Sequence, residues 1–259
     1  MTSDGPSPPR PTNDNGQRRR GFNFGDDLLM ALRFYSRLPT GSSPHERPDL
    51  NRIAPVLPLA SFVIGLVPAV VLLLLEWMGV PTFFAAAMAV AVMVVISGAM
   101  AEDAIADAAD GLFGGDSIDR RLEIMKDSRH GTYGVAAMAL LLIFRVTAAG
   151  SVIAPLEAAA LLLTAPLIAR SGGAAAGAGK VTPRNFVIGA AITVIVSFAS
   201  AGFAVGIAGL LAAYGICAIV TLGWVVMCRR LIGGQTGDLI GALQALLEIA
   251  ALTAFMVFV

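Results

Sequence analysis

The sequence contains little charge and little histidine. Only 14% of its 259 residues are charged, and 18 Lys and Arg balance 18 Asp and Glu, so the net charge is zero. Because no basic stripe with interleaved aromatic residues is present, nucleic acid is not an expected partner. The two histidines, His45 and His130, are too few and too far apart in the chain for a zinc site.

Cysteine and the common motifs of soluble enzymes are also scarce. Cys217 and Cys228 are the two cysteines, and they fall in or beside one apolar run. We expect both to be reduced packing residues rather than a disulfide. A Ser-His-Asp set, a P-loop and a strand-associated G-x-G-x-x-G are absent, which argues against the enzyme classes that those motifs mark.

Apolar residues are abundant instead. They make up 56% of the chain, and the mean hydropathy is +0.77. Long apolar runs recur, so the sequence predicts an all-α, polytopic transmembrane bundle rather than a β-barrel. About seven spans are expected, with ends uncertain by several residues, at 53–77, 81–101, 133–150, 152–169, 186–205, 207–228 and 239–258.

The first residues differ from the rest of the chain. Residues 1–21 are rich in Pro, Ser, Asn, Gly and Arg, so we expect a disordered tail that is not a cleaved signal peptide. Residues 22–259 are predicted to form a single integral-membrane catalytic domain. Asp26 to Leu38 has the pattern of a short interfacial helix that is ended by Pro39.

The cationic residues predict the orientation in the membrane. If the seven spans are right, all of the 18 Lys and Arg residues except Arg145 fall on the same side of the membrane. The positive-inside rule then places the N-terminus and the loop between the second and third spans in the cytoplasm. Arg145 lies inside the third span and needs a polar partner, for which Glu248 in the last span is the candidate. Whether that pair is structural or functional stays open.

An acidic stretch lies in the predicted cytoplasmic loop, and eight of the 18 acidic residues fall between Glu102 and Asp127. Asp103, Asp107 and Asp110 point in directions of roughly 0°, 40° and −20° on a helix, so one face carries three carboxylates. Like charges this close raise one another's pKa unless a cation sits among them. Oxygen ligands suit Mg²⁺.

A second acidic helix is expected directly afterwards. Gly111, Gly114 and Gly115 should break the first helix, and Asp116 or Ser117 should cap the next one. That next helix would carry Asp119, Glu123 and Asp127 on one face. The result is a cytoplasmic acidic helix-turn-helix whose two faces converge on one metal-diphosphate site. The competing interpretation is a solvated acidic loop between membrane spans.

Cationic and glycine-rich segments complete the predicted site. Lys126, Arg129 and Arg170 can surround a diphosphate, which favours attack by an alcohol on an activated phosphate with a nucleotide leaving. The stretch G-G-Q-T-G-D at residues 233–238 opens the last span. Its exposed amides and Asp238 can hold a nucleotide ring or assist the metal, or they form a turn in which Asp238 caps the helix.

Five motifs in this order carry a family resemblance: F-Y-S-R-L-P at 34–39, E-D-x-x-x-D-x-x-D-G at 102–111, R-R-L-E-I-M-K-D-S-R-x-G-T-Y-G at 120–134, Arg170-Ser171, and G-G-Q-T-G-D. The chain resembles the adenosylcobinamide-GDP ribazoletransferases, also called cobalamin-5′-phosphate synthases. The resemblance implies Mg²⁺-dependent joining of adenosylcobinamide-GDP to α-ribazole or its 5′-phosphate, with release of GMP, in a bacterial inner membrane. A homo-oligomer is compatible with it.

The predicted site therefore contains three groups of residues. The catalytic residues are Asp103, Asp107 and Asp110, and Asp127 joins them as a metal ligand. The substrate-binding residues are Arg37, Lys126, Arg129, Thr132, Arg170, Gln235, Thr236 and Asp238.

The sequence departs from the expected pattern H-E-D-G-x-x-D-x-x-D-G. Ala101 replaces the histidine, Ala104 replaces the first glycine, and His130 stands where an aliphatic residue is expected. Two other functions were weighed. A CDP-alcohol phosphotransferase would show D-x-x-D-G-x-x-A-R, but the A-R is missing after Gly111. A cation transporter would place its carboxylates inside the bilayer rather than in the longest loop.

The orientation can be tested with topology reporters. Alkaline phosphatase, which is active outside the cytoplasm, should be active when fused at Gly79 and inactive when fused at Lys180. A fluorescent protein that folds in the cytoplasm should give the opposite pattern, because the two positions follow the first and the fourth predicted spans. The same readout at both positions would show that the span count is wrong.

Overall fold

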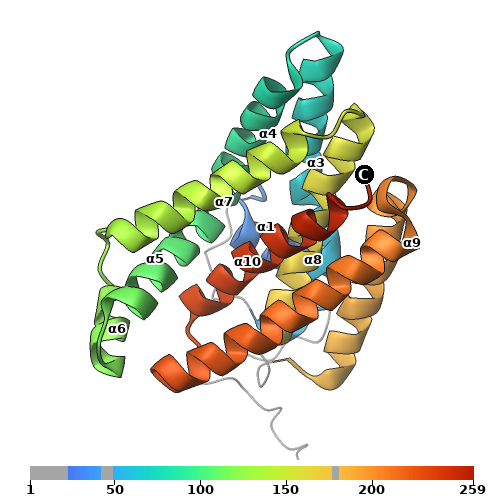
Figure 1. Cartoon of the computed structure of the whole chain (residues 1–259). Helices are drawn as coiled ribbons and strands as arrows, with labels where there is room; N and C mark the ends of the chain where they lie inside the picture. The colour runs from blue at the N-terminus through green and yellow to red at the C-terminus, as the bar shows by residue number, and fades with distance from the viewer. Residues whose placement is uncertain (1–22, 42–48, 177–180) are drawn as a thin grey trace, which may run out of the picture.

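The computed structural model describes residues 23–41, 49–176 and 181–259. Within these ranges every secondary-structure element is a helix, so the all-α prediction is confirmed (Figure 1). The helices are α1 (Phe24–Tyr35), α2 (Leu50–Ile53), α3 (Leu57–Trp77), α4 (Thr82–Ser97), α5 (Met100–Gly114), α6 (Ile118–Ile124), α7 (Thr132–Gly150), α8 (Pro155–Ala176), α9 (Pro183–Ile232) and α10 (Gly237–Phe255). The predicted tail at 1–21 lies outside the described residues.

Several helices are suited to a membrane. By length and composition α3, α7, α9 and α10 are each long and apolar enough to cross a bilayer. A fifth crossing results if α4 and α5 count together, although the two are bent by 83° at the break between them. The chain is therefore an all-α, polytopic membrane protein.

The predicted spans agree with the helices in place but not in every boundary. The seven ranges fall on α3, α4, α7, α8, the two arms of α9, and α10. The range 81–101 is wrong at its end, because α4 stops at Ser97 and Met100 already begins α5. α8 continues to Ala176, so Arg170 lies inside this helix and not in the connection after it. The count of about seven spans stays a prediction.

Gly206 divides α9 into two arms. Its φ of 65° and ψ of −177° are not helical, and this region is essentially restricted to glycine. The two arms are drawn in lighter and darker orange in Figure 1 and fold back on each other from this point. The sequence places a boundary between two predicted spans at the same position.

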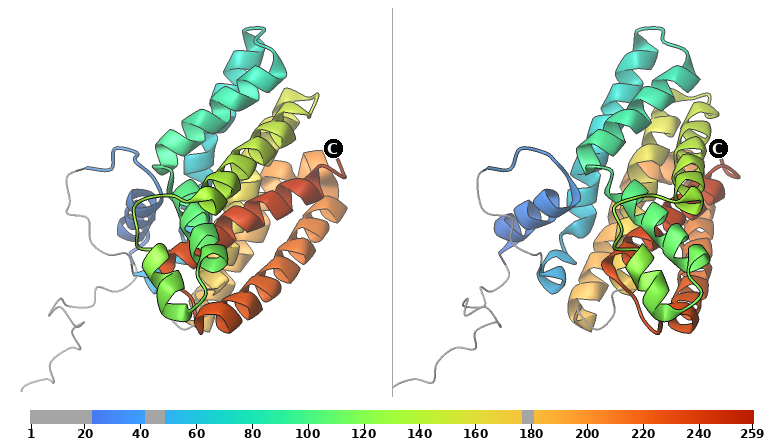
Figure 2. Two further views of the ribbon diagram at one scale, coloured as in Figure 1. Left: turned by 60° about the vertical axis from the view of Figure 1, so that its left-hand side comes forward. Right: turned by 90° about the vertical axis from the view of Figure 1, so that its left-hand side faces the viewer.

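The core lies around α8 and α10. α8 packs against α3, α9 and α10, while α10 also packs against α5, and α5 against α7. Ala and Leu dominate this core, and small residues such as Ala are expected where helices associate closely in a bilayer. Figure 2 shows α10 between α7 and the second arm of α9, with the α3–α4 hairpin projecting above them. Because α10 contacts α5 and α8, it connects the membrane core to the acidic helix.

The N-terminal helix forms a second, smaller cluster with the start of α3. Ala31 and Tyr35 of α1 are buried there against Ile53 and Leu57. The fully buried carboxylate of Asp27 forms an ion pair with Arg52 of α2 and accepts a hydrogen bond from the Asn23 amide. The predicted helix at 26–38 is thus present but ends at Tyr35, before the loop to Pro39.

The outer surface of α9 is apolar. Large apolar side chains remain exposed along this helix, as expected of a surface that faces lipid: Val187, Ile195, Phe198, Phe203, Leu211, Ile219 and Leu222.

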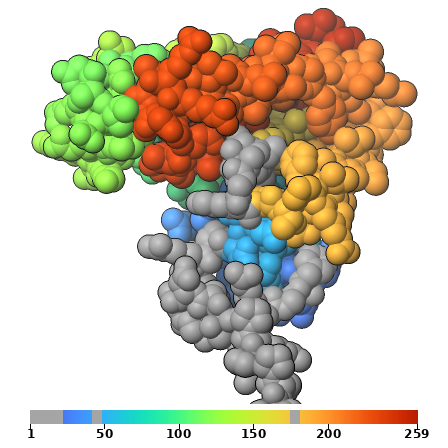
Figure 3. Space-filling model, turned by 90° about the horizontal axis from the view of Figure 1, so that it is seen from below, coloured from blue at the N-terminus to red at the C-terminus, as the bar shows by residue number. Residues whose placement is uncertain are grey.

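The connections between helices lie at opposite ends of the bundle. In Figure 1 the α3–α4 and α7–α8 turns lie at the top, and α6 and the end of α9 lie at the lower left. Figure 3, seen from below, shows α6 in green beside the end of α9 in orange-red. The Arg121 guanidinium joins these two segments by donating to the Leu231 carbonyl at 2.9 Å.

Two consecutive left-handed residues make the sharp turn between α4 and α5. Gly98 has a φ of 66° and Ala99 a φ of 56°, and Ala99 is the non-glycine residue with positive φ in the described chain. A left-handed conformation costs a residue with a Cβ about 1–2 kcal/mol. A Cβ at Gly98 would also lie 2.5 Å from the Arg37 Nε. The turn is therefore strained at position 99 and has no room at position 98.

These two positions predict opposite changes in stability. Ala99→Gly should raise the free energy of unfolding by up to about 1 kcal/mol, because glycine adopts positive φ without steric cost. Gly98→Ala should lower it by about 1–2 kcal/mol. Thermal unfolding of the purified protein in detergent measures both. Equal midpoints for the two variants would contradict the described turn.

Candidate active site

The acidic helix α5 has one buried face and one carboxylate face. Alanines and Glu102 are buried on the inner side, while the Asp103 side chain is 67% exposed and that of Asp107 is 16% exposed. Glu102 and Asp103 lie in the first turn, where the helix dipole favours negative charge. α5 continues through Gly111 to Gly114, so the prediction that Gly111 breaks it is wrong.

His130 lies across the first two aspartates. Its Nδ1 is 3.6 Å from the Asp107 Oδ1, and its Nε2 is 3.9 Å from the Asp103 Oδ1. His130 precedes α7, so it reaches this face from a different segment. The histidine that the family resemblance leads us to expect at position 101 is absent, whereas His130 places an imidazole over the aspartate pair.

The glycine-rich stretch before α10 brings a further carboxylate to this face. Thr236 caps α10 by accepting from the Leu239 amide at 3.3 Å, so Asp238 is not the cap. α10 packs closely on α5, since a Cβ at Gly241 would lie 2.6 Å from the Ala104 Cβ. Ala104 therefore faces α10 and is buried. The charge of Asp238 is close enough to act on Asp107.

The pKa of Asp107 responds to its buried position and to the neighbouring charges. Burial, followed by the charges of Asp103 and Asp238, raises the pKa of Asp107 to about 6, and His130 opposes the rise. The carboxylates therefore raise the pKa of Asp107 as the sequence predicts, but burial makes the larger contribution.

Asp110 has a different role from the other two aspartates. Its Oδ2 accepts from the Gly131 amide at 2.6 Å and its Oδ1 from the Gly134 amide at 2.8 Å. Asp110 is buried and caps the N-terminus of α7 from across the helix pair. Both of its carboxylate oxygens therefore accept backbone hydrogen bonds. The metal-ligand role of Asp110 stays a prediction.

The second acidic helix is shorter than predicted. Ser117 caps α6 by accepting from the Arg120 amide, but α6 ends at Ile124 and carries only Asp119 and Glu123. Asp127 lies beyond it and binds the exposed Arg129 through both carboxylate oxygens, at 3.0 and 2.7 Å. These hydrogen bonds lower the pKa of Asp127 to about 2. The predicted helical face through Asp127 is therefore wrong.

The convergence of the two acidic faces on one metal site stays a prediction. Among the residues that the structure describes, no group of three or more His, Cys, Asp or Glu side chains is arranged to hold a metal ion. Mg²⁺, however, commonly binds through one or two carboxylates together with water and substrate phosphates. Asp103 and Asp107, with Asp238 nearby, match that donor chemistry, and the raised pKa of Asp107 matches the need for positive charge.

A buried ionic cluster lies behind α5. The Arg145 Nε donates to the Glu248 Oε1 at 2.7 Å and its Nη2 to the Glu248 Oε2 at 2.8 Å, so the predicted partner is confirmed. Its Nη1 also pairs with Glu102. All three residues are at most 4% exposed. Sequence reasoning missed Glu102 as a partner of Arg145, although the apolar residues Ala104 to Ala106 on the same helix were a usable signal that this helix has a buried side.

Arg170 extends this cluster towards α1. Its guanidinium carbon lies 5.9 Å from the centre of the Tyr35 ring, and the Gln244 amide donates to the Tyr35 hydroxyl at 3.4 Å. Arg170 is within electrostatic range of Glu248 and Glu102. Arg170 is thus part of this network. The prediction that it joins Lys126 and Arg129 around the exposed aspartates is wrong.

The remaining predicted binding residues are spread along the same end of the fold. Lys126 and Thr132 are exposed, while Gln235 and Thr236 are half-buried before α10. The Gln235 Nε2 is buried and has no hydrogen-bond partner in the described ranges. Arg37 is exposed and packs against the turn at Gly98. These side chains are available to a ligand, but no contact joins them into one site.

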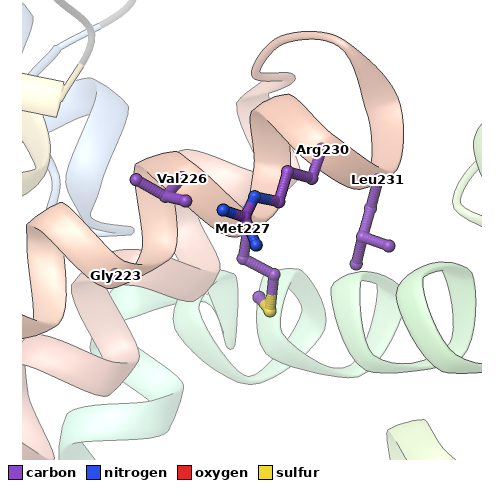
Figure 4. A pocket seen from close by; sticks show the side chains of 5 residues that line it. All are labelled: Gly223, Val226, Met227, Arg230 and Leu231. Carbon is purple, nitrogen blue, oxygen red and sulfur yellow. The ribbon is translucent and has the colours of Figure 1, made fainter.

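A small recess on α9 is separate from these residues. Gly223, Val226, Met227, Arg230 and Leu231 line it, and in Figure 4 Met227 and Leu231 point towards the neighbouring green helices. The lining is apolar apart from Arg230. Within the described chain, none of the predicted catalytic, metal or substrate residues contributes to it.

Comparison with known proteins identifies relatives along nearly the whole chain. The model of the Cobalamin-5-phosphate synthase family matches residues 27–256. An adenosylcobinamide-GDP ribazoletransferase of Azorhizobium caulinodans is 38% identical over 90% of this chain and 96% of its own length. Those of Xanthobacter autotrophicus and Mesorhizobium japonicum are 38% and 34% identical over 91% and 88% of this chain, and 97% and 91% of their own. No solved structure matches.

The Asp110 cap predicts intolerance of a side chain at position 134. A Cβ at Gly134 would collide with the Asp110 carboxylate and lie 2.8 Å from the Ala106 carbonyl oxygen. Gly134→Ala should therefore lower the free energy of unfolding by about 1–3 kcal/mol.

Gly215→Ala on α9 is the matched control, because no described atom lies within 4 Å of its added Cβ. This variant should be neutral or stabilising by up to about 1 kcal/mol. Unfolding in detergent measures both variants. Coincident midpoints would mean that α5 and α7 do not approach each other as described.

Proposed function

The chain belongs to the cobalamin-5-phosphate synthase family, and from this premise we propose the reaction that its acidic face performs. The protein is an adenosylcobinamide-GDP ribazoletransferase. It joins adenosylcobinamide-GDP to α-ribazole or α-ribazole 5′-phosphate and releases GMP. The observation that carries this conclusion is the family match over residues 27–256, which includes the whole acidic face and the stretch before α10. The match favours neither a CDP-alcohol phosphotransferase nor a cation transporter.

The bond changes define what the site must do. A ribose hydroxyl of the acceptor forms a new P–O bond with the phosphate attached to cobinamide. The diphosphate P–O bond breaks, GMP leaves with the electron pair of that bond, and the hydroxyl proton passes to a base. Charge builds up on the phosphate oxygens during this exchange. The site therefore needs positive charge at the diphosphate and a proton acceptor near the hydroxyl.

Asp103, Asp107 and Asp238 are suited to hold Mg²⁺ at this position. The metal, when bound, supplies positive charge to the diphosphate. What supports the assignment is the pKa of Asp107, which burial and then the charges of Asp103 and Asp238 raise to about 6. A carboxylate of this face that does not hold the metal can accept the hydroxyl proton.

Substrate contacts are assigned to the side chains around this face. Lys126, Arg129 and Arg37 are exposed cations that can bind phosphate oxygens. Thr132, Gln235 and Thr236 lie at the starts of α7 and α10, and the free amide of Gln235 is a donor for a nucleotide or ribose. Arg170 acts from the buried network. Asp127 is assigned to orient Arg129 rather than to bind the metal, because Arg129 engages both of its oxygens.

The membrane setting follows from the same arrangement. We expect a multi-pass protein of the bacterial inner membrane, with the acidic face and the N-terminus in the cytoplasm. The clustering of the cationic connections at one end of the bundle supports this orientation. Both substrates would then reach the site from the cytoplasm or the membrane surface.

Removal of the Asp107 charge tests the proposal. In Asp107→Asn, GMP release from the two substrates should fall by about 10²-fold while the protein stays folded, because the cation loses one of its carboxylate ligands. Asp119→Asn, an exposed acidic residue on α6, is the matched control and should keep its activity.

The metal is tested separately. Excess chelator should abolish GMP release by the wild-type protein, and Mg²⁺ should restore it. Full turnover in chelator would refute the Mg²⁺ assignment. Absence of GMP release by the wild type under all conditions would refute the proposed reaction.

A further inference from the structure

The buried cluster joins three helices through one guanidinium. Arg145 of α7 forms a two-pronged hydrogen bond with Glu248 of α10 and pairs with Glu102 of α5. With Arg170 nearby, two acidic and two basic side chains share the interior. α5 and α10 are also the helices that bring Asp107 and Asp238 together. The cluster therefore lies directly behind the proposed active site.

Stability alone does not account for these charges. Burial of an ion pair carries a large desolvation cost, and apolar side chains of similar volume are often equally or more stabilising. The Glu102 Oε2 is buried and has no hydrogen-bond partner in the described part of the chain, so the cluster is not even fully satisfied. An arrangement that is costly and incomplete points to a role other than stability.

The geometry supplies such a role on α5. Glu102 immediately precedes Asp103, and successive residues on a helix point about 100° apart. When Arg145 holds Glu102 inward, the rotation of α5 about its axis is set. Asp103 and Asp107 must then face outward towards His130.

The same guanidinium sets the position of α10. Glu248 lies ten residues after Asp238 in one continuous helix, which corresponds to about 15 Å along the axis. Holding Glu248 therefore limits the sliding and rotation of the end that carries Asp238. A planar guanidinium can form the fork with Glu248 and reach Glu102 at the same time, whereas a lysine ammonium cannot reproduce that geometry.

We propose that Arg145 is a positioning residue, which sets α5 and α10 in register and thereby holds Asp103 and Asp107 opposite Asp238. The inference rests on the proposed function in assigning those aspartates to the reaction. The register itself can be measured without any reaction. Arg145 does not contact the exposed aspartates, so its effect on them passes through Glu102 and Glu248.

The main test variant is Glu102→Leu/Arg145→Met. It removes one charge of each sign, so the net charge of the interior is unchanged. The matched control is Asp27→Leu/Arg52→Met, which removes another ion pair, between the fully buried Asp27 and the partly buried Arg52 of α1 and α2, away from the acidic face. Arg145→Lys is the second variant, because it retains the charge and should fold even if the double variant does not.

The register is read from spin labels on cysteines introduced at Gly114 and Gly237. Both positions are exposed, and the described atoms leave room for a Cβ at each. The native Cys217 and Cys228 are buried free thiols and should label poorly. The wild type and the control should give one narrow distance distribution between α5 and α10. The Glu102/Arg145 variant and Arg145→Lys should give a broadened one.

GMP release by unlabelled protein is the second readout. In the two Arg145 variants it should fall about tenfold to 10²-fold, the effect of a small misplacement of reacting groups, and in the control it should not. A narrow, unchanged distance distribution in both Arg145 variants would overturn the inference, whatever their rates. If the wild type releases no GMP, the proposed function fails, while the distance measurement still decides whether Arg145 sets the register.

Discussion

The pairing of Arg145 in an apolar interior is the constraint on which the rest of the structure depends. A guanidinium that cannot lose its proton must find carboxylates when it is placed inside a membrane bundle. Glu248 and Glu102 are those carboxylates, and they come from the two helices that flank α7. The position of one charge therefore ties α5, α7 and α10 together. The acidic face lies on the outer side of that junction.

Around this junction the helices approach one another through small residues. Gly134 admits the Asp110 carboxylate to the start of α7, and Gly241 admits Ala104 to α10. Asp110 thus acts in the structure as a cap, while Asp103 and Asp107 remain free to bind a ligand. Three aspartates of similar sequence context have been separated into two roles by the elements that pack against them.

The departures from the family pattern are explained in part by the same packing. Ala104 faces Gly241 in a helix contact and does not line the aspartate face, so its methyl group need not affect a ligand. Ala101 is half-buried against the core. His130, by contrast, lies over Asp103 and Asp107. An imidazole is therefore present at this face although the expected histidine at position 101 is not.

The sequence by itself determined what depends on local pattern: the helical class, the acidic face of α5, a helix cap at Asp116 or Ser117, and a boundary between two apolar segments at Gly206. It also named Glu248 as the candidate partner of Arg145, because a lone buried charge is costly. Only the tertiary structure decided which carboxylates face one another. Asp238 lies within electrostatic range of Asp107, Asp110 binds α7 and Glu102 binds Arg145, because helix rotation and register are set by contacts between residues far apart in the chain. The periodicity of a sequence predicts that a helix has a polar face, but it does not determine which other helix packs against that face or at what angle.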